Sequence, residues 1–115
     1  KQTPLLSPAS SLIINAIKVL SKLPDDMNLL SPSILEPILK LRKDNKPLSL
    51  QEVLIALSIC SVTNSIIEKA IKNLKKLENC EAHSTYIVQN GDANALKSLK
   101  INLTCESDFY STEII

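Results

Sequence analysis

The sequence predicts an α/β fold in which four long helices and one short crossover helix cover a small, partly parallel sheet of about three strands. Two strand-like runs bracket a short helical stretch between residues 80 and 106. Four longer stretches before them carry apolar residues at helical spacing. The chain has 115 residues, of which 44% are hydrophobic, so residues 1–115 are expected to form a single domain with its own core.

The first two predicted helices share a Ser-Pro start. Ser7-Pro8 begins the first helix, because serine is a favoured N-cap and proline a favoured first helical residue. Pro24 is expected to stop it. Ser31-Pro32 repeats this start in the second helix, which Pro37 should bend because proline removes a backbone donor. The short run between the two helices, residues 27–30, supplies the third predicted strand.

The next two helices are predicted from their N-caps and apolar residues. Ser49 and Glu52 fit a capping box, in which each side chain satisfies a backbone amide at the helix start. Residues 53–60 are apolar nearly all round, so this third helix is expected to be the most buried. A fourth long helix should begin at Thr63 or Asn64 and continue the helical apolar pattern.

The central strand pair is predicted at residues 83–89 and 101–106. The first run is rich in β-branched and aromatic residues, and the second alternates between apolar and polar residues. Asn90-Gly91-Asp92 between them has turn chemistry, and Asp92 is expected to cap a short helix at residues 93–100. A strand, a crossover helix and a strand together imply a parallel pair with a right-handed connection.

The two-residue period of a strand places polar side chains of both strands on one side of the predicted sheet. This group includes the only histidine of the chain and two carboxylates that could orient it. His83 and Glu81 are therefore candidate catalytic residues, with the histidine as a general base. The candidate binding residues of the same face are Thr85, Asn102, Thr104 and Glu106.

A structural interpretation of this polar face competes with the catalytic one. The face could pack against a helix, another domain or another subunit, with hydrogen bonds satisfying its polar groups. Ser84 is next to His83 in sequence but on the opposite face of a regular strand, which is a poor position for an activated nucleophile. We favour the structural interpretation, because a histidine beside carboxylates is common in interfaces.

The sequence contains no complete metal or phosphate signature. Cys80-x-x-His83 with Cys105 could be drawn as a zinc site, but residues three apart on a strand point to opposite faces and a fourth ligand is missing. With Gly91 as the only glycine, a Gly-rich phosphate loop is excluded. The cofactor, if the protein uses one, is unknown.

Charge and composition argue against nucleic acid and membranes as partners. Thirteen basic and twelve acidic residues give a net charge of +1, so no overall field attracts either surface. Three aromatic residues offer little for base stacking, and no run approaches the roughly 20 apolar residues of a membrane span. Three cysteines without a disulfide-framework spacing favour reduced thiols and a cytoplasmic location.

Four blocks of the chain resemble the C-terminal region of an uncharacterised bacterial family, catalogued as domain of unknown function eighteen-forty-six. They are LSPSILEPILKLR, LSLQEVLIALSICSVTN, CEAHSTYIV and LKINLTCE, and they occur in the family's order. The resemblance implies that an N-terminal portion is absent here. It also implies a three-layer α/β subdomain similar in topology to the cytidine-deaminase fold. The deaminase signature, His-x-Glu with Pro-Cys-x-x-Cys, is absent, so the resemblance does not extend to deaminase chemistry.

We therefore expect a C-terminal structural or interaction domain that packs against the missing N-terminal portion of the same protein. A contribution to a homo-oligomer is a further option. This hypothesis predicts an exposed apolar or mixed patch beside Glu81, His83 and Glu106. The alternative is an enzyme whose active site lies between domains and uses His83 and Glu81. It predicts a concave pocket at the polar face.

Overall fold

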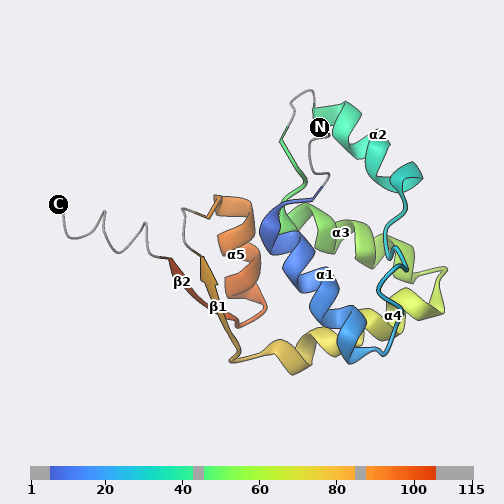
Figure 1. The fold of residues 1–115 in the computed structure, drawn as a ribbon. Coiled ribbons are helices and arrows are strands. Elements are labelled where there is room, and N and C mark those ends of the chain that lie inside the picture. The colour runs from blue at the N-terminus through green and yellow to red at the C-terminus, as the bar shows by residue number, and fades with distance from the viewer. Residues whose placement is uncertain (1–5, 43–45, 85–87, 106–115) are drawn as a thin grey trace.

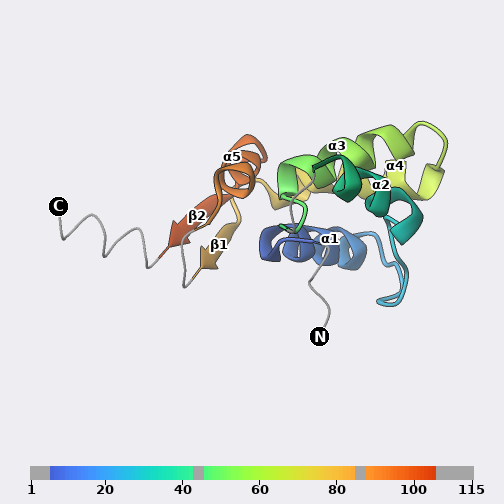
Figure 2. The same cartoon turned by 90° about the horizontal axis from the view of Figure 1, so that it is seen from above.

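The computed structural model describes residues 6–42, 46–84 and 88–105, and it shows a group of helices beside a small sheet (Figure 1). This confirms the predicted α/β class. The sheet lies at one end of the molecule with α5 beside it, and the other helices form the rest (Figures 1 and 2). In chain order the elements are α1 (Pro8–Leu20), α2 (Pro32–Arg42), α3 (Leu50–Ser61), α4 (Ser65–Lys72), the 3-10 helix η1 (Asn73–Leu77), β1 (Glu81–Ser84), α5 (Asn90–Ser98) and β2 (Asn102–Cys105).

The helix starts follow the capping residues of the sequence. Ser7 caps α1, with its Oγ accepting a hydrogen bond from the Ser10 amide at 3.2 Å. The predicted capping box is present in α3, where the side chains of Ser49 and Glu52 each accept a backbone hydrogen bond. Asn64 is the N-cap of α4. These starts are local features, so the sequence alone predicts them.

The sheet of the described chain has two strands, so the prediction of about three is wrong. Residues 27–30 form no strand. Leu29 and Leu30 are both buried in the core, whereas consecutive side chains of a strand point to opposite faces. With two strands, the sheet does not establish the three-layer, deaminase-like topology that the resemblance implied.

The two strands are parallel, as predicted from the crossover helix between them. Glu81 pairs with Asn102, and His83 pairs with Thr104. The first strand begins two residues earlier than expected, and residues 85–87 of the predicted strand lie outside the described residues. The helix between the strands also begins earlier than expected, at Asn90.

The core consists of two clusters that meet at α3. One cluster joins α1, α3 and α4, and its fully buried side chains include Ile17 and Leu57. The other joins α1, α3 and α5 around Leu50 and Leu96. The parts of α3 that face these clusters are buried, as expected for a central helix. Within the described residues, no helix is long and apolar enough to pass through a membrane.

The third helix is not buried all round, which corrects the prediction from its composition. Ile55 and Ile59 of α3 are 58% and 68% exposed. The helices α1 and α4 cover one side of α3 and α5 covers another, but in the described part of the chain no element covers the side that carries these two residues. An apolar sequence pattern shows which side chains favour burial, and the number of neighbouring elements decides how many are buried.

Candidate functional site

The register of β1 and β2 brings four of the six predicted site residues onto one exposed sheet face. Glu81 lies opposite Asn102, and His83 lies opposite Thr104. All four side chains are exposed. The other two predicted members, Thr85 and Glu106, lie outside the described residues. The predicted polar face is therefore present for the part of it that the structure describes.

Thr104 contacts the ring of His83. The Nδ1 atom of His83 lies 3.3 Å from the Oγ1 atom of Thr104, and this hydroxyl donates to the carbonyl oxygen of Ala82, also at 3.3 Å. A hydroxyl has one proton to donate. With that proton directed to Ala82, the Thr104 oxygen is placed to accept a hydrogen bond from Nδ1 of the tautomer that carries its proton there.

A cleft of about 800 Å³ lies beside the carboxyl end of β1. Its lining includes His83 and Ser84 of β1, Leu12 of α1 and Gln89 before α5. The carboxyl ends of strands are where ligands bind in open α/β sheets, and this volume is within the range of about 300–1,000 Å³ usual for ligand sites. The structure thus places His83 at a cleft, whereas Glu81 does not contribute to its lining.

The charged wall of this cleft is fixed by an ion pair. Arg42, at the end of α2, donates through Nη1 to the Glu52 carboxylate at 3.0 Å and to the carbonyl oxygen of Pro47 at 3.1 Å. Lys46 adds a second cationic side chain to the lining. Because Glu52 also closes the capping box of α3, the ion pair ties this wall to the start of that helix.

Asp92, whose buried carboxylate lines the cleft, has a different role from the one predicted from the sequence. Asp92 is 4% exposed, and its Oδ1 accepts hydrogen bonds from the Leu50 amide at 2.7 Å and the Ser7 hydroxyl at 2.9 Å. It therefore caps α3 instead of α5, whose N-cap position is Gln89. The carboxylate also offsets the partial positive charge at the α3 N-terminus. Its partners are 85 and 42 residues away, so no local pattern reveals this role.

Gly91 allows this close approach of α5 to the start of α3. A Cβ atom at this position would lie 2.9 Å from both Cβ and Oγ of Ser49. The sequence suggested a turn glycine, yet Gly91 does not have a positive φ. The absence of a side chain, and not backbone freedom, is what the packing uses here.

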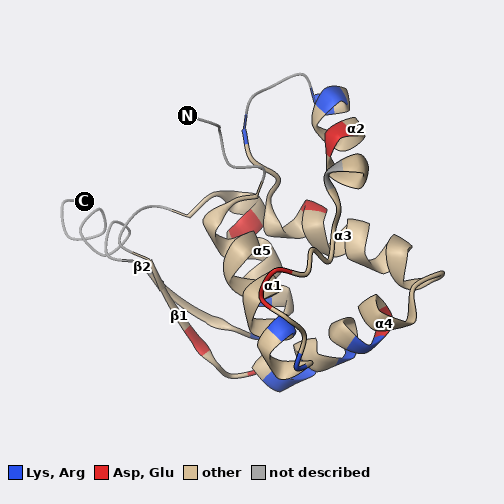
Figure 3. Cartoon of the chain, turned by 45° about the vertical axis from the view of Figure 1, so that its right-hand side comes forward, with Lys and Arg blue, Asp and Glu red and all other residues tan. Residues whose placement is uncertain are grey.

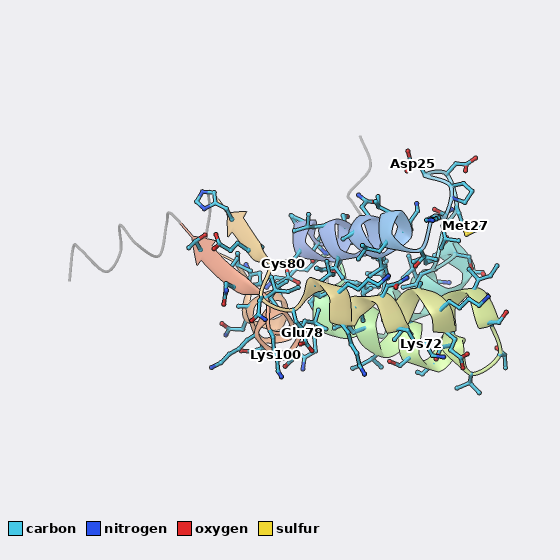
Figure 4. All side chains as sticks on the ribbon, turned by 90° about the horizontal axis from the view of Figure 1, so that it is seen from below. Asp25, Met27, Lys72, Glu78, Cys80 and Lys100 are labelled. Carbon is cyan, nitrogen blue, oxygen red and sulfur yellow. The ribbon has the colours of Figure 1, made fainter. Side chains whose placement is uncertain are left out.

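The cysteines do not assemble a metal site in the described part of the chain, where no three His, Cys, Asp or Glu side chains form a group that could hold an ion. Cys60 is half-buried in α3. Cys80 is exposed at the junction of η1 and β1, near Lys100 (Figure 4). The side chain of Cys105 lies outside the described residues.

An exposed apolar surface also lies away from the polar sheet face. We call it the α3–α4 stripe, and its members are Ile55, Ile59, Val62 and Ile66. Ile55 and Ile59 lie one helical turn apart on α3, Val62 follows the end of α3, and Ile66 is in the first turn of α4. Figure 1 shows this α3–α4 connection at the end of the molecule opposite the sheet, so the stripe is not beside His83. The helix α3 carries no charge after its first turn (Figure 3).

Comparison with known proteins gives the family of the chain. The model of a family described as "Domain of unknown function DUF1846, C-terminal" matches residues 1–115. A UPF0371 protein of Clostridioides difficile (strain 630) is 41% identical over 119 residues, which covers 99% of this chain and 24% of that protein. A UPF0371 protein of Fusobacterium nucleatum is 40% identical over 114 residues, covering 95% of this chain and 22% of that protein.

A third relative agrees with these two. A UPF0371 protein of Clostridium tetani is 34% identical over 119 residues, with 99% of this chain and 24% of the relative covered. The chain thus spans about a quarter of the length of the curated relatives that it matches. The family model matches from the first residue to the last, which confirms the resemblance inferred from the four sequence blocks. The chain belongs to the family described as domain of unknown function DUF1846, C-terminal.

Proposed function

We propose that this chain is a C-terminal interaction domain that packs against the remainder of a longer protein through the α3–α4 stripe. The observation that carries the proposal is the exposure of the stripe, whose members are 58%, 68%, 82% and 44% exposed in chain order. Large exposed apolar side chains that lie in neighbouring parts of a surface are a sign of a binding site. The curated relatives supply a candidate for that cover, because about three quarters of their length lies outside the matched region.

Covering the stripe contributes to the free energy of docking. Burying an isoleucine side chain that was exposed stabilises an interface by about 1.5–3 kcal/mol. The stripe has three isoleucines and one valine. After Glu52, α3 has no charged residue. A partner that docks on this part of α3 therefore removes no α3 charge from water.

Replacing Ile59 by aspartate in the full-length protein tests this docking surface. We expect Ile59→Asp to lower the free energy of unfolding by about 2–4 kcal/mol, because a carboxylate would replace an apolar side chain inside the interface. Thermal and urea unfolding measure the effect, and limited proteolysis reports whether the domain is released. Leu41→Asp is the matched control, since Leu41 is 83% exposed on α2 and outside the stripe.

The two variants would behave alike if the α3–α4 stripe faced water in the full-length protein, and the docking proposal would then be wrong. Sedimentation velocity adds a second outcome. If Ile59→Asp instead converts an oligomer into monomers without releasing the domain to proteases, the stripe joins two copies, and docking to the rest of the same chain is contradicted.

A second candidate function is an enzyme active site at the cleft, completed by the rest of the longer protein. The observation that favours it is the position of His83, which lines a cleft of about 800 Å³ at the carboxyl end of a parallel strand. In this hypothesis Nε2 of His83 accepts or donates a proton. Glu81 contributes no lining to the cleft, so this hypothesis assigns the proton transfer to His83.

Ligand-dependent stabilisation of the full-length protein tests this second candidate. Specific binding raises the melting temperature by mass action. We expect a nucleotide, a phosphorylated metabolite or a divalent metal to raise the melting temperature of the wild type and not that of His83→Ala. Lys97→Ala, an exposed change on α5 outside the cleft, is the control. Equal shifts in His83→Ala and the control would contradict a role of His83 in binding.

A further inference from the structure

We infer that, in the longer protein, the outer edge of β2 pairs with a strand from the remainder of the same polypeptide, so that β1 and β2 form part of a larger sheet. The inference rests on the proposed packing of this domain against that remainder. It concerns a different surface from the α3–α4 stripe, and it specifies the partner as an extended segment of chain that forms backbone hydrogen bonds.

The first argument is the size and type of the sheet. Parallel sheets usually occur with several strands and with both faces covered. Here the described sheet consists of β1 and β2. The helix α5 packs with the side of the sheet that carries Ala82 and Leu103, and the opposite side carries exposed polar residues. A two-stranded parallel sheet with one exposed face is typical of the edge of a larger sheet.

The second argument is the direction of the backbone groups of β2. The Asn102 amide donates to the Cys80 carbonyl at 2.8 Å, so the backbone of Asn102 faces β1. Backbone direction alternates along a parallel strand. Thr104 therefore also faces β1, which agrees with the contact of its hydroxyl with Ala82. Leu103 and Cys105 direct their N–H and C=O groups to the outer edge.

The third argument is the composition and position of that edge. Lysines and other charged residues, prolines and bulges prevent an exposed edge strand from pairing with another chain. The sequence of β2, Asn-Leu-Thr-Cys, has no charge and no proline, whereas β1 carries Glu81. Figures 1 and 2 both show β1 between β2 and α1, so the outer edge of β2 faces away from α1, and α5 packs against the sheet.

The lengths of the relatives favour a strand of the same polypeptide over a second copy. About three quarters of each of the UPF0371 relatives compared above lies outside the matched region. A segment tethered to the domain binds at a high effective concentration, in the millimolar range for short flexible linkers. A second copy would have to supply the same hydrogen bonds at the much lower concentration of free protein.

Amide hydrogen exchange in the wild-type full-length protein tests the inference without any substitution. Mass spectrometry with single-residue fragmentation resolves the amides of Leu103 and Cys105 at the outer edge of β2. We expect both to exchange at least about 100-fold more slowly than unprotected amides, and to be protected like the Thr104 amide inside the β1–β2 ladder. The Glu81 amide, on the outer edge of β1, is the comparison and is expected to exchange faster.

Each other outcome overturns the inference. Fast exchange at Leu103 and Cys105 beside a protected Thr104 would show an open edge. Protection at Glu81 alone would place the added strand on β1. Protection that is lost on dilution to the monomer would assign the strand to a second copy. The proposed function is tested separately by Ile59→Asp, which probes the stripe. If the outer amides of β2 exchange fast while Ile59→Asp destabilises the protein, the strand pairing is wrong and the docking proposal stands.

Discussion

Replacing Asp92 by alanine is expected to lower the free energy of unfolding by about 2–4 kcal/mol. The change removes the acceptor for the Leu50 amide and for the Ser7 hydroxyl. Leu50 is fully buried, so its amide has no water to replace the lost carboxylate. A buried donor left without a partner costs about 1–3 kcal/mol, and hydrogen bonds to charged groups are the stronger ones. Urea unfolding measures the change.

Two further substitutions separate this capping role from a general effect of charge. Asp92→Asn keeps an oxygen acceptor at the same place, so we expect it to cost less than the alanine variant. Asp26→Ala removes a carboxylate from an exposed position and is expected to change the free energy of unfolding by less than about 0.5 kcal/mol. If Asp92→Ala were no more destabilising than Asp26→Ala, the carboxylate would not link α3 to α1 and α5 as the structure shows.

Leu57→Ala is the second change with a large expected effect, about 2–5 kcal/mol of destabilisation. Leu57 is 1% exposed in the cluster that joins α1, α3 and α4, and its truncation leaves a cavity that rigid helices fill only in part. Urea unfolding again measures the loss. Leu41→Ala is the same chemical change at a position that is 83% exposed, and it should cost less than about 0.5 kcal/mol.

The comparison of Leu57→Ala with Leu41→Ala also tests whether Leu41 is exposed in the full-length protein. Equal costs for Leu57→Ala and Leu41→Ala would mean that α2 packs in the full-length protein through the side that carries Leu41. Such a result would also remove Leu41 as a control for the docking experiment.

The part of the fold that was predictable depends on interactions between residues close in sequence. Ser7, Ser49 and Asn64 satisfy amides two or three residues ahead of them, so helix starts follow from the local chain. The parallel pairing of β1 and β2 follows from the short helix between them. The alternation of side chains along each strand then placed His83 and Thr104 on one face.

The remaining features were decided by contacts between segments distant in the chain. Asp92 caps α3 and not α5, because packing brings its carboxylate to the Leu50 amide, 42 residues away. Leu29 and Leu30 fill the core and do not form a third strand, because the helices around them leave an apolar space at that point.

The exposed side of α3 shows the same division between sequence and tertiary structure. The residue pattern of α3 is enough to predict an apolar helix with a capping box at its start. Which of its apolar residues are covered depends on the packing of other elements, because burial requires a neighbour and the helices α1, α4 and α5 leave Ile55 and Ile59 exposed.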